Sequence, residues 1–268
     1  MIPEILATGA ALGAASKIKE DSILGLIYKD SLQPSFQKIG KAIGTALEFS
    51  TIPFKLLQQK NDKVSANLQR QLEIYEQKLK DVPEENVIEV NPHIGVPIVD
   101  RLSYTTNDEI ASLFTNLLTK ASSSVTVNQA HPAFVQIIER LSVDEARILQ
   151  VLTLTPNTPC ITLRAYYQVE GYIDILSKAT LLHTRVDLLF PDNMSLYLDN
   201  LVSLGIITSP PNTYLTNQGI YEPIQEAYNY NELKVAYENH ESFKSLEIVR
   251  GLFETTNFGT AFLQACAS

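Results

Sequence analysis

Apolar residues recur at helical spacing most regularly between residues 104 and 152, where the pattern predicts three successive helices. Residues 106–109 (Thr-Asn-Asp-Glu) and 142–145 (Ser-Val-Asp-Glu) each match a capping box, in which a Ser or Thr side chain and a Glu side chain satisfy free N–H groups at a helix start. Between them, Pro132 suits the first turn of a helix. The expected buried positions are Ile110, Leu113, Phe114, Leu117, Leu118 and Ala121 in the first helix, and Phe134, Val135, Ile137, Ile138 and Leu141 in the second.

A further amphipathic helix is predicted to begin earlier in the chain, at Pro34, with an apolar face formed by Phe36, Ile39, Ile43 and Leu47. Gly40 and Gly44 lie four residues apart and would let another helix approach closely. The hydrophobic stretch at residues 42–57 contains Glu48, Pro53 and Lys55, so it falls short of the ~18 uncharged apolar residues of a membrane-spanning helix. We expect this helix to pack on the protein's own core. The alternative is that residues 33–57 contact a membrane surface.

A polar helix is predicted next, over residues 64–80, with one narrow apolar seam. The seam repeats at spacings of three and four residues and consists of Val64, Leu68, Leu72, Tyr75, Leu79 and Val82. Such a seam needs a partner helix. The sequence allows a partner within the chain, because fewer than three heptads rarely hold a free coiled coil together, and self-association is the alternative.

Three prolines in residues 83–97 oppose a continuous helix and mark the clearest boundary in the chain. The sequence therefore predicts an N-terminal helical arm at residues 1–82, a connector at residues 83–97, and a helical core with a C-terminal module at residues 98–268. Residues 1–15 are apolar but carry Glu4 and lack a basic start, so we do not expect a cleaved secretory signal.

The pattern changes after residue 155, where extended and helical segments alternate. Residues 160–167 alternate as a strand does, residues 170–182 suit a helix, and a helix from Met194 ends at Gly205. Residues 206–208 and 213–216 flank a Pro-rich turn and are predicted to pair as a hairpin. Residues 216–219 (Thr-Asn-Gln-Gly) and 256–259 (Thr-Asn-Phe-Gly) are both expected to turn from a strand into a helix. The predicted fold class is α+β and mainly α-helical, with a central helical element followed by a winged-helix-like module.

Several of these segments resemble the bacterial abortive infection alpha family. The likeness lies in Asn116-Leu117-Leu118, in His131-Pro132-Ala133-Phe134-Val135 and in Leu141-Ser142-Val143-Asp144-Glu145-Ala146-Arg147-Ile148-Leu149. It continues in Tyr197-Leu198-Asp199-Asn200-Leu201, Leu204-Gly205-Ile206-Ile207, Tyr214-Leu215-Thr216 and Gly219, and ends in Phe258-Gly259-Thr260-Ala261-Phe262 with Ala265-Cys266. Thr255-Thr256 stands where the family has a Leu-Thr pair. The resemblance covers most of the chain from about Gly40 onward and implies a bacterial protein that acts in defence against phage.

Charge is distributed unevenly along the chain. Residues 1–80 hold 11 Lys and Arg against 8 Asp and Glu, which gives +3, whereas residues 81–268 hold 10 against 22, which gives −12. A winged-helix-like module raises DNA binding as an alternative, but residues 186–233 contain no Lys or Arg with which to neutralise phosphates. Nucleic acid is therefore not an expected partner. The two cysteines, Cys160 and Cys266, fit no metal or redox spacing and suggest free thiols in a reducing cytosol.

The sequence contains no pattern typical of catalysis. There is no phosphate-binding loop, no Gly-x-Ser-x-Gly and no His-Glu-x-x-His, and the four histidines are dispersed. His131 has two interpretations, a general base or partner contact, and a side chain that caps the helix start before Pro132; the second is favoured. Helix capping also accounts for the adjacent carboxylates of Asp144 and Glu145. No cofactor and no metal are expected.

We therefore expect a non-enzymatic component of abortive-infection phage defence that works through protein contacts, with a protein partner or self-association. The expected location is the cytoplasm, with a peripheral position at the inner membrane as the alternative. Two other functions remain open: a membrane-acting effector whose arm inserts on activation, and a regulatory or scaffold protein without a defence role. A hydrolase or nuclease has the least support. The candidate interaction residues are His131, Asn116, Ile39, Gly40, Ile43, Gly44, Leu47, Leu68, Leu72, Tyr75 and Leu79.

Overall fold

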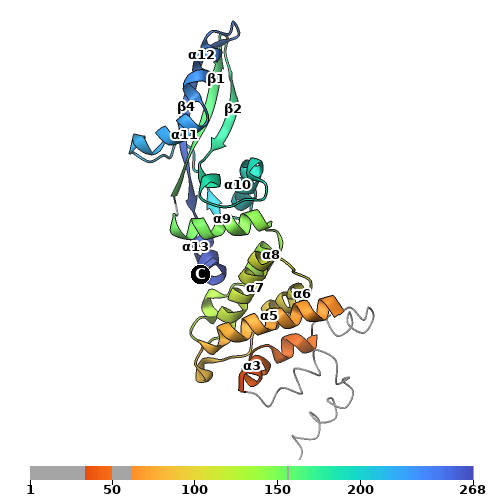
Figure 1. Cartoon of the computed structure of the whole chain (residues 1–268). Coiled ribbons are helices and arrows are strands. Elements are labelled where there is room, and N and C mark those ends of the chain that lie inside the picture. Colours follow the sequence, from red (N-terminus) through yellow and green to blue (C-terminus); the bar gives the residue numbers. More distant parts are fainter. Residues whose placement is uncertain (1–33, 50–61, 156, 268) are drawn as a thin grey trace, which may run out of the picture. The chain divides into compact units, whose positions relative to one another are not determined.

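The computed structural model describes residues 34–49, 62–155 and 157–267, without the side chains of residues 34–37, 47–49, 62–66 and 218. The expectations for residues 1–15 and 50–57 lie outside the described residues. The chain divides into two compact units, residues 1–139 and residues 140–268. Figure 1 colours the first from red to yellow-green and the second from green to blue. This division after Glu139 differs from the predicted arm, connector and core, because the helices of the arm pack directly on those that follow the connector.

In its described part, the first unit is built from helices. They are α3 (Pro34–Phe49), α5 (Asp62–Lys80), α6 (Pro92–Leu102), α7 (Asp108–Ala121) and α8 (Ala133–Glu139), with short 3₁₀ helices η1 (Glu84–Asn86) and η2 (Val127–Gln129). Leu117 and Ile138, which the pattern places in the core, are fully buried. The three predicted central helices are therefore confirmed as α7, α8 and α9 (Val143–Leu154), although α9 belongs to the second unit.

Helix α3 packs inside the first unit, as expected for a core helix. Ile39 and Ile43 are at most 1% exposed, and the backbone N–H of Val90 donates to the carbonyl oxygen of Ala42 at 2.8 Å. The predicted close approach at Gly40 and Gly44 is not seen, because no described atom lies within 4 Å of a Cβ built at either position. The close approach occurs instead at Gly95 of α6, where an added Cβ would lie 2.8 Å from the Cβ of Ala46.

The apolar seam of α5 has its partners within the chain. Leu68, Leu72, Tyr75 and Leu79 are all buried, and α5 packs against α3, α6 and α7. The Tyr75 hydroxyl lies 2.5 Å from the Ser122 hydroxyl, so the seam's one polar group is satisfied inside the core. Burial raises the pKa of Tyr75, and the bond to Ser122 only partly opposes the rise. Of the two alternatives for this seam, the structure shows the partner within the chain.

Two local predictions in this unit are wrong. Residues 92–97 are not part of an irregular connector, because α6 runs through Pro97: Asn91 caps the helix by accepting from the N–H of His93, and Pro92 occupies its first turn. The cap of α7 is Asn107 rather than Thr106, since the Asn107 side chain accepts from the N–H of Ile110 at 3.0 Å. The Ser142 capping box at the start of α9 is confirmed.

The second unit combines an antiparallel sheet with helices. After α9 follow β1 (Asn157–Tyr167), β2 (Tyr172–Ala179), η3 (Leu182–Thr184), η4 (Pro191–Asn193), α10 (Met194–Ser203), β3 (Ile207–Thr208), η5 (Gln218–Ile220), α11 (Glu222–Ala227), α12 (Tyr230–Glu238), β4 (Phe243–Thr255) and α13 (Asn257–Cys266). The described strands lie in the order β2-β1-β4-β3. Figure 1 shows α12 running beside the long strands, where it packs against β4. The chain is thus α+β, as expected.

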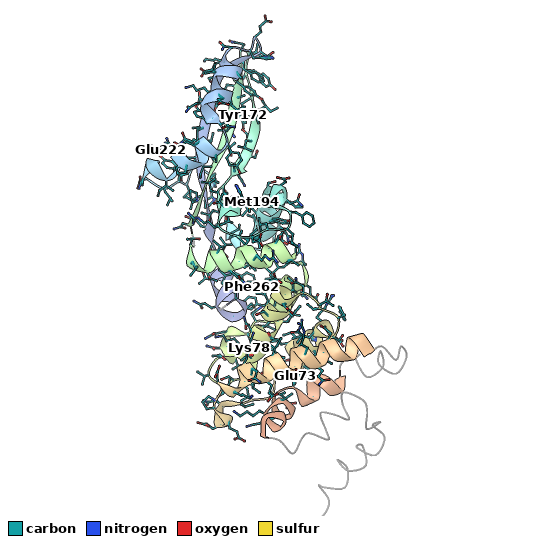
Figure 2. The ribbon with its side chains drawn as sticks, viewed as in Figure 1. Glu73, Lys78, Tyr172, Met194, Glu222 and Phe262 are labelled. Atoms are coloured by element: carbon teal, nitrogen blue, oxygen red, sulfur yellow. The ribbon has the colours of Figure 1, made fainter. Side chains whose placement is uncertain are left out.

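One face of the sheet forms the core of this unit. Ile161, Leu163 and Ala165 of β1 alternate into a buried cluster that also contains Tyr221, Ile224 and Leu246. The residues between them face the other side, where Arg164 pairs with Asp174 through two hydrogen bonds of 2.7 and 3.1 Å. The Arg164 guanidinium also lies 3.8 Å from the centre of the Tyr172 ring, labelled in Figure 2.

The winged-helix-like detail of the module is not confirmed. Residues 170–182 contain strand β2 rather than a helix, because Gly171 (φ +114°) closes a hairpin that returns the chain antiparallel to β1. Residues 213–216 are not a strand. The short strand β3 pairs with β4, at Ile207 with Thr255 and at Thr208 with Glu254, so the partner comes from far along the chain.

The turn from β4 into α13 requires a glycine. Thr256 caps α13 by accepting from the N–H of Gly259 at 2.8 Å, and its hydroxyl donates to the carbonyl of Gly205 at 2.6 Å. A Cβ built at Gly259 would lie only 1.9 Å from the carbonyl oxygen of Ile206. The predicted strand-to-helix turn at residues 256–259 is confirmed, whereas residues 216–219 follow no strand and enter the 3₁₀ helix η5.

Candidate interaction site

Helix α9 begins with three polar side chains, those of Ser142, Asp144 and Glu145, which hydrogen-bond to one another's backbone or to residues in and before α10. The backbone N–H of Ser142 donates to Glu145 Oε2 at 2.6 Å, and the N–H of Glu145 donates to Ser142 Oγ at 3.2 Å. This capping box turns Asp144, between the two, toward the chain segment that precedes α10.

Asp144 is buried and accepts three hydrogen bonds. Its Oδ1 accepts from the N–H of Leu189 at 2.8 Å, and its Oδ2 accepts from the N–H of Phe190 at 2.9 Å and from the Tyr197 hydroxyl at 2.7 Å. Burial alone would raise the pKa of Asp144, but these bonds, with the nearby charge of Arg147, lower it below its ordinary value. The same contact and burial raise the pKa of Tyr197. Asp144 is therefore held as an anion.

Two further contacts join α9 to the same region. Glu145 Oε1 accepts from Asn200 Nδ2 at 2.7 Å, and Arg147 Nη1 donates to the carbonyl oxygen of Asp187 at 2.8 Å. We call Asp144, Glu145, Arg147, Tyr197 and Asn200 the clasp. The clasp fixes α10 and residues 187–190 to α9.

Comparison with known proteins identifies the group to which the chain is related. The sequence profile described as "Abortive infection alpha" matches residues 60–266. The chain belongs to the abortive infection alpha family. Two of the segments that carry the family resemblance contact each other in this chain, since Asp144 accepts from Tyr197 and Glu145 accepts from Asn200. Membership of this family supports a role associated with abortive infection.

The other comparisons add little. A comparison with curated proteins finds no match. A solved structure, described as an uncharacterized protein from the hydrocarbon-degrading marine bacterium Alcanivorax borkumensis SK2, is similar at 17% sequence identity with a TM-score of 0.32. The match covers 55% of this chain and 100% of that one. Similarity at this level carries no argument about fold or function.

The clasp presents three large apolar side chains to solvent in this abortive infection alpha protein. Leu189 is 57% exposed, and Phe190 and Leu196 are each 63% exposed. Leu196 lies on α10, which begins at Met194, labelled in Figure 2. We call Leu189, Phe190 and Leu196 the display surface. Elsewhere in the described residues, Val169 and Tyr172 at the β1–β2 turn are also more than half exposed, and the other large apolar residues exposed by more than half occur singly, which is ordinary for a protein surface.

Acidic residues flank the display surface. Asp187, Asp192 and Asp199 are exposed. Asp192 lies in η4, four residues before Leu196, and Asp199 lies on α10 one turn after Leu196. Sequence reasoning missed the display surface because the apolar residues 188–190 precede Pro191 outside any periodic element. The sequence does contain one indication of this surface: the apolar run at residues 188–190 lies within residues 186–233, which contain no Lys or Arg.

The structure places His131 and Asn116 in the first unit. His131 is exposed at the start of α8, where its Nδ1 accepts from the N–H of Ala133 at 3.2 Å and its ring contacts Phe134. This hydrogen bond agrees with the helix-capping interpretation of His131, and a partner contact through the exposed ring stays a prediction. Asn116 Oδ1 accepts from Lys78 Nζ, which also donates to Thr115 Oγ1 at 3.0 Å. Burial lowers the pKa of Lys78, which Figure 2 labels on α5.

The remaining predicted interaction residues lie in or near the core of the first unit. Ile39, Ile43, Leu68, Leu72, Tyr75 and Leu79 are buried, Gly40 is exposed and Gly44 is half-buried. The side chain of Leu47 lies outside the described residues. Among the described residues no three or more His, Cys, Asp or Glu side chains are grouped to hold a metal ion. Nor does that part of the chain contain a helix with the length and apolar character needed to cross a membrane.

Proposed function

We propose that this abortive infection alpha protein acts in phage defence as a non-enzymatic component, by binding another protein through the display surface. The observation that carries the proposal is the contrast between backbone and side chains at Leu189 and Phe190. Their N–H groups are fixed by the buried carboxylate of Asp144, whereas their side chains lie mostly in solvent.

Fixing the backbone favours binding. A surface that is ordered before binding loses less conformational freedom when its partner arrives, so more of the contact free energy remains as affinity. Large apolar and aromatic side chains also contribute most to the free energy of protein association when they enter a partner's pocket. Phe190 has the size, exposure and fixed backbone expected of such a residue.

The clasp carboxylates support a structural role. Both oxygens of Asp144 and both oxygens of Glu145 accept hydrogen bonds from backbone or side-chain donors within the unit. A general base must instead reach a proton on a substrate, with a pKa near the working pH. The lowered pKa of Asp144 and its occupied oxygens favour anchoring over proton transfer.

Insertion of the arm into a membrane is less favoured by the packing of α3. Ile39 and Ile43 would have to leave the core of the first unit, and the apolar surface that they cover there would be left exposed to water. The protein-contact proposal needs no such rearrangement, because the display surface is already exposed.

Phage plating tests the proposal. Cells carrying the wild-type protein, Phe190→Ser with Leu196→Ser, or the control Val235→Ser would be challenged with a panel of phages, and survival of the infected cells would be scored. Val235 is an equally exposed apolar residue on α12. We expect the double variant to lose protection while its thermal midpoint stays near that of the wild type. Full protection by a stably expressed double variant would overturn the proposal.

A further inference from the structure

We infer that the display surface binds a cationic amphipathic helix of a partner protein, an inference that rests on the proposed function of this surface. The apolar centre and the acidic rim together select the partner. Leu189, Phe190 and Leu196 call for apolar side chains, and the exposed carboxylates of Asp187, Asp192 and Asp199 call for Lys or Arg around them.

The charged side chains on the segments that form the display surface are all negative. No Lys or Arg occurs from Val186 to Leu233, and the positive groups nearest in sequence or contact are Arg147 and Arg185. The Arg147 guanidinium is already engaged, since it donates to the carbonyl oxygen of Asp187. A partner's cations would therefore meet the carboxylates of Asp192 in η4 and Asp199 in α10, and neither helix contains a Lys or Arg.

The spacing of the carboxylates defines the partner's pattern. Asp192 in η4 and Asp199 in α10 are seven residues apart, which corresponds to at most roughly 12 Å, since a 3₁₀ helix rises about 2.0 Å and an α-helix about 1.5 Å per residue. A partner helix that lies along α10 would match this distance with two basic residues seven positions apart. Leu, Ile or Phe between them, on the same face, would reach Phe190 and Leu196.

A second copy of the chain fits this surface poorly. Residues 140–268 contain 8 Lys and Arg against 14 Asp and Glu, a net charge of −6. Pairing two display surfaces through a two-fold axis would bring both sets of three carboxylates together, and like charges at an interface oppose association. The same charges oppose nucleic acid and anionic lipid.

The direct test uses full-length protein and two synthetic 14-residue helical peptides. Both peptides carry the same Leu stripe; one has Lys and the other Glu at the two flanking positions seven residues apart. Fluorescence anisotropy at low and high salt would compare the wild type with Asp192→Lys/Asp199→Lys and with the control Glu222→Lys/Glu226→Lys. Both variants change the net charge equally, and the control residues are exposed on α11.

We expect the Lys peptide to bind the wild type, with binding weakened at least tenfold by Asp192→Lys/Asp199→Lys and by Phe190→Ser, and less than about twofold by the control. Equal loss in both charge variants would show attraction by net charge alone and would overturn the inference. So would equal binding of the Glu peptide, or a wild-type dimer in sedimentation that Phe190→Ser dissociates.

Phage plating distinguishes a failure of the proposed function, protein binding through the display surface, from a failure of the cationic-helix inference. If Phe190→Ser/Leu196→Ser loses protection and Asp192→Lys/Asp199→Lys keeps it, surface binding stands and the cationic partner is wrong. If Phe190→Ser/Leu196→Ser keeps protection, the proposed function itself fails, whatever the peptides do. Loss of protection in both, with the Glu222→Lys/Glu226→Lys control still protective, is the result that supports a cationic partner.

Discussion

At the scale of single residues, Asp144 anchors the segment before α10 to the start of α9. A buried carboxylate is costly unless its oxygens are hydrogen-bonded, and here two backbone N–H groups and the Tyr197 hydroxyl meet that need. Removing the charge leaves those donors with a weaker acceptor or none. Asp144 therefore links the start of α9 to the segment that carries the display surface.

A double-mutant cycle measures the link between Asp144 and Tyr197. We expect Asp144→Asn and Tyr197→Phe each to lower the free energy of unfolding by about 1.5–3 kcal/mol, because both break a bond to a charged group. The double variant should cost less than the sum, with a coupling of about 0.5–3 kcal/mol in urea unfolding. Asp144→Asn combined with Tyr221→Phe, which shares no hydrogen-bond partner with Asp144, should be additive.

The pH dependence of stability provides a second test of Asp144. Because its folded pKa is lowered, the carboxylate stabilises the fold above its unfolded pKa of about 3.9, and that contribution disappears as the pH falls through the folded pKa. The difference in unfolding free energy between the wild type and Asp144→Asn should therefore shrink as the pH is lowered from 6 to 3. Leu201→Ala, which truncates a buried apolar side chain, should show a constant difference. A constant difference for Asp144→Asn as well would mean that its pKa is not lowered.

At the scale of elements, helix α3 tests which face of the arm is buried. Ile43→Asp should lower the free energy of unfolding by at least about 3 kcal/mol, because it places a carboxylate in a fully buried position. Gly40→Ala on the exposed face of the same helix should stabilise by about 0.5–1 kcal/mol. Thermal unfolding would measure both. A stable Ile43→Asp protein that no longer protects cells would instead favour the membrane-acting alternative.

Two glycines in similar sequence segments, Gly259 at the start of α13 and Gly219 in residues 216–219, test how closely α13 packs against Ile206. Gly259→Ala should unfold the protein or render it insoluble, because the new Cβ would overlap the carbonyl oxygen of Ile206. Gly219→Ala is the matched control from residues 216–219, since its Cβ would meet only the Asn217 Oδ1, at an ordinary contact distance of 3.5 Å. Soluble yield and thermal midpoint of the purified variants would be compared. A Gly259→Ala protein as stable as Gly219→Ala would show that α13 is not packed this closely.

At the scale of the whole molecule, net charge restricts the partners. The chain carries −9, and its longest stretch without Lys or Arg coincides with the display surface and α11. We expect no binding to duplex DNA above the non-specific level in a mobility-shift assay at near-physiological salt, because phosphate neutralisation needs clustered Lys and Arg. A tight, salt-sensitive complex would contradict this and would direct attention to the +3 charge of residues 1–80.

What the sequence by itself determined about this protein is local. The Ser142 capping box, the buried faces of α3, α5 and α7, strand β1 and the end of α10 at Gly205 all follow from residues within one or two turns of each other. The resemblance to the abortive infection alpha family likewise came from short stretches, and the profile match over residues 60–266 confirmed it.

Only the tertiary structure decided the features that join distant residues. Strand β3 pairs with β4 about 47 positions away, which the nearer hairpin pattern concealed, and β2 replaced a helix because a neighbouring strand offered it a hydrogen-bonding edge. The partners of Asp144 lie 45–53 positions away, so its role could not be distinguished from simple helix capping. The exposure of Leu189, Phe190 and Leu196 was hidden for the same reason: an apolar residue is buried or exposed according to what the rest of the fold places beside it.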